Sequence, residues 1–232
     1  KTMKKNALFL AACAALFSCS PKSEVMLIDS SAFNAEVDGK QVSLYTIQEG
    51  DLTMQVTNFG ARVVTLWTPD KAGNQEDVVL GYNNLDNYVN NPGERFLGAV
   101  VGPYANRIAN GTYTIGEETY NFPQNNNGQT LHGGLKGLDM VVWDVDTVTA
   151  NSIVLSYLRP DGDEGMPGNL KIVMKYTLTQ ENEFRVDYLA ETDKATHVNI
   201  SHHSFFNLKG EGKGTINDHV LYINASKTTP VD

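Results

Sequence analysis

Cysteine is almost absent from this sequence. Cys13 and Cys19 are the only two among 232 residues, and both lie near the N-terminus. Cleavage of the leader described below would leave at most Cys19, so we expect no disulfide within the mature chain. A cysteine-based metal site and a thiol nucleophile are excluded on the same ground.

Basic residues are also scarce. The chain has 18 Lys and Arg against 27 Asp and Glu, a net charge of −9, which becomes −12 if residues 1–19 and their three lysines are removed. A strongly acidic surface repels polyanions. We therefore expect neither nucleic acid nor an anionic membrane surface as a direct partner.

No apolar run is long enough to span a bilayer, which takes about 20 residues. An eleven-residue run at 7–17 follows Lys4 and Lys5 and ends near Cys19. This pattern is typical of a secretory signal, and Leu16-Phe-Ser-Cys19 resembles the lipobox of bacterial lipoproteins. We expect residues 1–19 to be a signal peptide, with Cys19 lipidated and the protein held at the bacterial cell envelope, facing the periplasm or outward. Plain secretion and an uncleaved anchor remain alternatives.

Helical periodicity is lacking after the leader. Residues 20–37 look like a tether, and from residue 41 short runs rich in Val, Ile, Leu, Thr and Tyr alternate with Gly, Asn, Asp and Pro. This pattern predicts one all-β domain over residues 38–232, an antiparallel sandwich or barrel. The expected strands cover residues 42–47, 52–57, 62–67, 111–115, 153–158, 170–178 and 184–190.

Residues 197–208 contain three histidines and two asparagines in a strand-like stretch. In an extended chain successive side chains point to opposite faces, so His202 and His203 diverge. His202 shares a face with Val198 and Ile200 and is predicted to be a core residue. His203 lies on the polar face, and because an imidazole can exchange protons near neutral pH, it is the first candidate for catalysis.

Two other stretches carry polar groups suited to a ligand. Asn106 and Arg107 place an amide beside a planar guanidinium, a pair that can bind vicinal hydroxyls. His132 precedes Gly133 and Gly134, which would let a ligand approach the backbone. Either stretch alone is weak evidence, because a lone arginine or histidine is more often structural.

Taken together and in order, these stretches resemble the aldose 1-epimerase (galactose mutarotase) family. The matching blocks are Asn58-Phe-Gly-Ala61, Pro69-Asp-Lys-Ala-Gly73, Val78-Val-Leu-Gly-Tyr82, Ala105-Asn-Arg-Ile-Ala-Asn-Gly111, Leu131-His-Gly-Gly134, Asp161-Gly-Asp-Glu-Gly-Met-Pro-Gly168 and Val198-Asn-Ile-Ser-His-His-Ser-Phe-Phe-Asn-Leu208. The resemblance implies a large antiparallel β-sandwich with an open sugar cleft. It covers the N-terminal two-thirds of the family's domain, so C-terminal strands are expected to be missing from this chain.

The resemblance also implies the reaction, which interconverts the α and β anomers of free aldoses such as galactose and glucose. A carboxylate takes the proton of the anomeric hydroxyl while a histidine, here His203, protonates the ring oxygen and the ring opens. Asn106, Arg107 and His132 would bind the sugar. Phe205 and Asn207 would line the same site. Neither a cofactor nor a metal is implied.

This chain departs from the family pattern at three positions, of which the first is Pro103, where relatives often have arginine. His202 replaces a usual asparagine and Phe205 a usual tyrosine. The family's base glutamate and a sugar-binding aspartate lie beyond the position of Asp232, so we expect little activity from the chain alone.

Two other functions remain open. A non-catalytic carbohydrate-binding β-sandwich would keep Arg107, His132 and the aromatic residues without needing an acid and a base. A hydrolase with His132, His202 and His203 as metal ligands is disfavoured because adjacent strand histidines diverge.

Overall fold

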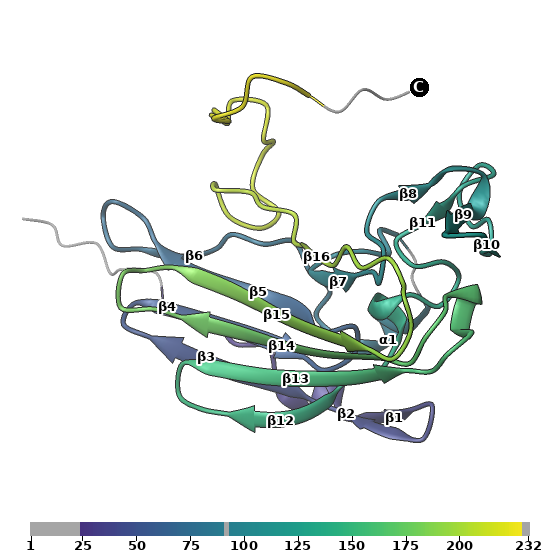
Figure 1. Ribbon diagram of the computed structural model, residues 1–232. Helices are drawn as coiled ribbons and strands as arrows, with labels where there is room; N and C mark the ends of the chain where they lie inside the picture. The colour runs from purple at the N-terminus through teal and green to yellow at the C-terminus, as the bar shows by residue number, and fades with distance from the viewer. Residues whose placement is uncertain (1–23, 91–92, 229–232) are drawn as a thin grey trace, which may run out of the picture.

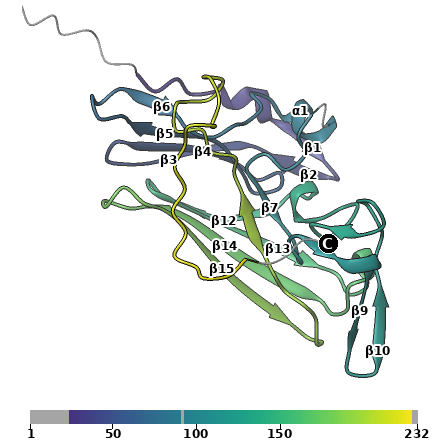
Figure 2. The same cartoon turned by 90° about the horizontal axis from the view of Figure 1, so that it is seen from above.

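The computed structural model describes residues 24–90 and 93–228, in two layers of antiparallel strands (Figures 1 and 2). Cys19 and the predicted signal peptide lie outside these residues. One sheet runs in the order β3 (Leu44–Glu49), β4 (Leu52–Thr57), β5 (Arg62–Pro69) and β6 (Gln75–Asp77). The other runs in the order β12 (Asp144–Val148), β13 (Ser152–Arg159), β14 (Leu170–Leu178) and β15 (Phe184–Thr192). The prediction of an antiparallel β-sandwich is confirmed.

The main core lies between the two sheets. On β14 every second residue is buried, and Ile172, Met174 and Tyr176 have no exposed surface. They pack with Met54 of β4 and with Trp143, which is also fully buried. The alternation follows from the pleat, which sends successive side chains to opposite faces.

β4 is buried along its whole length because its second face is also covered. A second apolar cluster lies there and includes Phe33, Phe59 and Tyr88. Tyr88 belongs to α1 (Leu85–Asn90), the one α-helix among the described residues. Of the helices in the described ranges, none combines the length and apolar character needed to cross a bilayer.

The prediction of a tether with little structure over residues 20–37 is wrong for its second half. Residues 30–37 form a 3-10 helix, η1 (Ser30–Phe33), and β1 (Ala35–Val37), which pairs with β2 (Lys40–Val42). Phe33 is fully buried, and the amide of Gln55 bonds both backbone groups of Ile28. The folded domain therefore begins before residue 38, since these contacts fix the segment against the first sheet.

Shorter elements lie at one end of the sandwich. β8 (Arg107–Ile108) pairs with β11 (Thr130–Leu131), and β9 (Thr112–Ile115) forms a hairpin with β10 (Glu118–Asn121). The 3-10 turns η2 (Ala109–Gly111), η3 (Leu138–Met140) and η4 (Asp163–Gly165) lie in the connecting loops. The extended stretch predicted over residues 197–205 is a strand only at β16 (Ser201–His203), paired with β7 (Ala99–Val101).

Candidate active site

β16 sends its two histidines to opposite sides. The His202 ring packs edge-on against Tyr176 and Phe184 of the second sheet. Its Nδ1 lies 3.0 Å from the Tyr176 hydroxyl and its Nε2 lies 2.6 Å from the Ser204 hydroxyl. Burial, and then the charge of His203, lower the pKa of His202 to about 4. The prediction that His202 is hydrogen-bonded and turned toward the core is confirmed, although its side chain is partly rather than fully buried.

His203 faces three rings on the other side of the strand. The ring centroids of His132, Phe205 and Phe96 lie 5.1, 5.1 and 5.6 Å from its own. Neither ring nitrogen of His203 has a hydrogen-bond partner among residues 24–90 and 93–228. Both nitrogens therefore remain available for proton exchange with a ligand.

His132 is held in a fixed orientation by the backbone of Asn106. Its Nδ1 accepts the Asn106 N–H at 2.9 Å, so in the neutral ring the proton is on Nε2. Burial lowers the pKa of His132 to about 4, with further contributions from His203 and Arg107. His132 is therefore uncharged at neutral pH and offers Nε2–H as a hydrogen-bond donor.

The glycines after His132 serve packing between backbone segments. Gly133 has φ +92°, and a Cβ there would collide with the carbonyl oxygen of Gly102. A Cβ on Gly134, at φ +98°, would collide with the Glu164 carboxylate, which instead accepts the Leu135 N–H at 2.7 Å. Protein atoms thus lie next to Gly133 and Gly134, where the sequence suggested that a ligand approaches the backbone. These close contacts require glycine and fix the conformation of the loop after His132.

Arg107 lies exposed at the start of β8, beside the His132 loop. Its Nε donates to the Asn126 Oδ1 at 3.1 Å and its Nη1 to the Asn106 Oδ1 at 3.3 Å. These bonds orient the guanidinium, whose remaining N–H groups can reach a ligand. Asn106, Arg107, His132, His203 and Phe205 are thus connected through neighbouring contacts, as the sequence resemblance implied.

Comparison with known proteins shows the family to which this chain belongs. The family described as Aldose 1-epimerase matches residues 43–232. The chain belongs to the aldose 1-epimerase family. It is 40% identical over 191 residues to the galactose mutarotase of Bos taurus, covering 82% of this chain and 55% of that protein. The aldose 1-epimerase of Haemophilus influenzae is 35% identical over 208 residues, covering 89% of this chain and 59% of that protein.

Solved structures of similar proteins have the same fold. The GalM/aldose epimerase homologue from C. elegans has a TM-score of 0.69 at 31% identity, over 73% of this chain and 52% of that one. Galactose 1-epimerase from Lactobacillus acidophilus has a TM-score of 0.65 at 31% identity, over 75% and 51%. The chain thus spans little more than half the length of these relatives.

The side chain of Asn207 has a structural role. Its side chain is 6% exposed, and its Nδ2 donates to the carbonyl oxygens of Gly210 and Lys213. Its Oδ1 accepts the Lys209 N–H at 3.1 Å. Both polar atoms of its side chain thus hold the turn after residue 207, so Asn207 is not assigned a sugar contact.

Phe96 belongs to the site but was not identified from the sequence. Its ring contacts His132 at 4.7 Å and His203 at 5.6 Å between centroids, and the Arg95 guanidinium lies 5.1 Å from its centroid. Arg95 is itself held by two bonds to the fully buried Asp139 carboxylate, at 2.7 and 3.0 Å. A lone phenylalanine in a loop gives no periodic signal, so only the fold shows its position.

Proposed function

We propose that this chain supplies the acid and the sugar-binding residues of an aldose 1-epimerase acting on free galactose, glucose or a related aldose. The supporting observation is the contrast between two adjacent imidazoles. His132 has one nitrogen fixed by backbone and a pKa of about 4, whereas both nitrogens of His203 are free of partners among the described residues. One ring is built to donate a hydrogen bond, and the other can transfer a proton.

In the proposed reaction His203 gives a proton to the ring oxygen of the sugar. A carboxylate takes the proton of the anomeric hydroxyl, the bond between the anomeric carbon and the ring oxygen breaks, and an open-chain aldehyde forms. Rotation and reclosure on the other face, with both proton transfers reversed, give the second anomer. His132 donates Nε2–H near the ring oxygen, and Asn106 and Arg107 bind hydroxyls.

Binding can be tested on the chain itself through its histidine ring signals in NMR. Adding D-galactose is expected to shift the signals of His132 and His203 together, with one shared saturation curve. The His219 ring, whose Nε2 accepts the Leu208 N–H at 2.9 Å, serves as an internal control and should stay constant. Arg107→Ala should weaken both shifts. A shift of His203 without His132 would show that the two rings do not share a ligand.

We further propose that Cys19 is acylated and that the protein is lipid-anchored in the bacterial cell envelope. The support is the basic start, the apolar run at 7–17 and the cysteine that follows it. Wild-type protein should sediment with membranes, and Cys19→Ser should be released. Soluble wild-type protein that fractionates like the variant would refute the anchor.

A further inference from the structure

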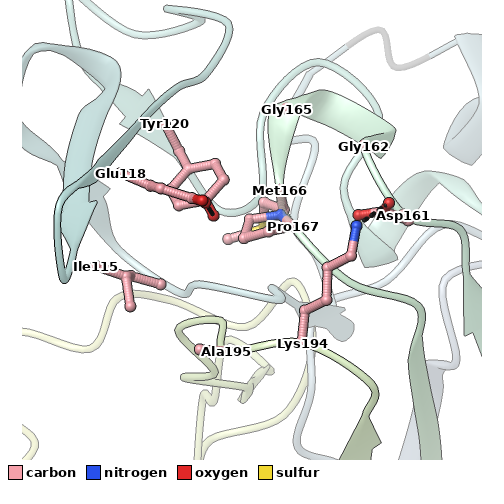
Figure 3. A pocket seen from close by; sticks show the side chains of 10 residues that line it. All are labelled: Ile115, Glu118, Tyr120, Asp161, Gly162, Gly165, Met166, Pro167, Lys194 and Ala195. Carbon is pink, nitrogen blue, oxygen red and sulfur yellow. Dashed lines mark hydrogen bonds and ion pairs between the residues drawn. The ribbon is translucent and has the colours of Figure 1, made fainter.

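A cavity of about 670 Å³ lies between three segments that are distant in sequence (Figure 3). Glu118 and Tyr120 come from β10, Met166 and Asp161 from the loop at residues 161–168, and Lys194 from the segment after β15. The volume is in the range of small-molecule sites, roughly 300–1,000 Å³. No hydrogen bond or ring contact joins these five described residues to His132 or His203.

The cavity has an apolar wall and a polar rim. Met166 is 4% exposed and packs in a cluster with Ile108 and Phe122, with the Tyr120 ring against it. The Tyr120 hydroxyl donates to the Glu118 carboxylate, which raises the pKa of Tyr120. This bond orients the phenol at the edge of the cavity (Figure 3).

The opposite side of the rim carries an ion pair. The Lys194 Nζ lies 2.5 Å from the Asp161 Oδ2, while the Asp161 Oδ1 accepts the Gly168 N–H at 2.6 Å. The ammonium still has two protons to donate, and the Glu118 carboxylate has a further oxygen to accept with. The rim thus carries two carboxylates and one ammonium, so an anionic ligand is disfavoured.

We propose that this cavity is a second carbohydrate site, which binds a neutral saccharide. It would bind independently of the site around His132, His203 and Arg107, called the imidazole site below. Each hydroxyl of a sugar can donate and accept, so different hydroxyls of one saccharide can bond Glu118 and Lys194. The carbon-bound hydrogens of a sugar ring can pack on the apolar wall formed by Tyr120 and Met166. This assignment goes beyond the proposed epimerase reaction.

The two sites are linked by one loop. Glu164, in the middle of residues 161–168, accepts the Leu135 N–H beside the His132 loop, while Asp161 and Met166 line the cavity. A saccharide bound in the cavity therefore contacts the loop that also bonds Leu135, three residues after His132.

Methyl β-D-galactopyranoside and lactose are the probes for this site. The methyl glycoside has no free anomeric hydroxyl, so it cannot undergo the proposed reaction. Both probes are titrated into the full chain and into Arg107→Ala, which weakens the imidazole site. The readout is the methyl NMR signal of Met166, with Met54 and Met174, both fully buried in the main core, as internal controls.

We expect at least one probe to shift the Met166 signal saturably, equally in wild type and Arg107→Ala. Lys194→Ala and Glu118→Gln, both at exposed positions, should weaken binding about tenfold, as loss of a hydrogen bond to a charged group does. Lys40→Ala is the matched control, since Lys40 forms a comparable exposed ion pair with Asp144 and neither residue lines the cavity.

Three results would overturn the second site: no Met166 shift with either probe, a shift abolished by Arg107→Ala, or equal affinities for Lys194→Ala and Lys40→Ala. A failure of the epimerase proposal gives a different pattern. In that case the Met166 shift persists while free galactose leaves the His132 and His203 signals unchanged.

Discussion

Replacing His203 by asparagine is expected to lower turnover by about 10²–10⁴-fold, because a general acid contributes a factor of that size. The protein for this test is the active one that is extended by the C-terminal part. Neither ring nitrogen of His203 has a hydrogen-bond partner among the described residues, and the centroid of its ring lies 5.1 Å from that of His132. Asparagine can form a hydrogen bond but cannot deliver a proton to the ring oxygen. Polarimetry on freshly dissolved α-D-galactose measures the loss.

His202→Asn is the matched control, one residue away on the same strand. The His202 ring lies between Tyr176 and Phe184 and bonds the hydroxyls of Tyr176 and Ser204. Asparagine can keep one of these bonds, and it is the residue that the family usually has there. Turnover should therefore be largely retained. Equal losses in the two variants would mean that the assignment of acid and core histidine is wrong.

Replacing Asp139 by asparagine is expected to cost about 3–5 kcal/mol of unfolding free energy, the range for a buried ion pair that loses one partner. Asp139 and Arg62 are both fully buried, and Arg95 binds the same carboxylate with two hydrogen bonds. Burial already lowers the pKa of Arg62, and its guanidinium lies 5.0 Å from the ring centroid of Tyr88. Removing the carboxylate leaves a desolvated cation without a counter-charge.

Urea unfolding of Asp139→Asn against Asp144→Asn measures this effect. Asp144 pairs with Lys40 at the surface, where ion pairs contribute little, so its variant should unfold near the wild-type midpoint. A midpoint for Asp139→Asn equal to that of Asp144→Asn would contradict the account. Because Arg95 stacks on Phe96, which contacts both imidazoles, the histidine NMR signals should also change in Asp139→Asn alone.

Much of the fold was predictable because the chain pattern has a period of two. The strands expected at 52–57 and 170–178 have those same bounds in the structure, and the divergence of His202 and His203 followed from the same rule. The tether prediction failed because the burial of Phe33 depends on Phe59 and Tyr88, which are distant in sequence.

The residues of the candidate site could be predicted where they belong to sequence motifs. They could not be predicted where tertiary contacts determine the orientation or the role of a side chain. Arg107 and His132 were identified from their motifs. The hydrogen bond from the Asn106 N–H that orients His132 could not be predicted, because it forms only when β8 pairs with β11. The role of Asn207 in its turn depends on bonds to residues 209–213, which no local pattern indicates.

The rate of mutarotation tests the central claim most directly. Protein ending at Asp232 and protein extended by the C-terminal part from its own gene or a relative are compared by polarimetry on α-D-galactose, per mole of folded protein. The account predicts that the extended protein speeds the approach to equilibrium well above buffer. Protein ending at Asp232, tested without the C-terminal glutamate that the resemblance implies, is predicted to give only a small part of this acceleration. If the extended protein binds galactose without any acceleration, the chain is a sugar-binding module and the epimerase proposal is contradicted. If the shorter chain is equally fast, the base lies within these residues and the expectation of a C-terminal glutamate is wrong.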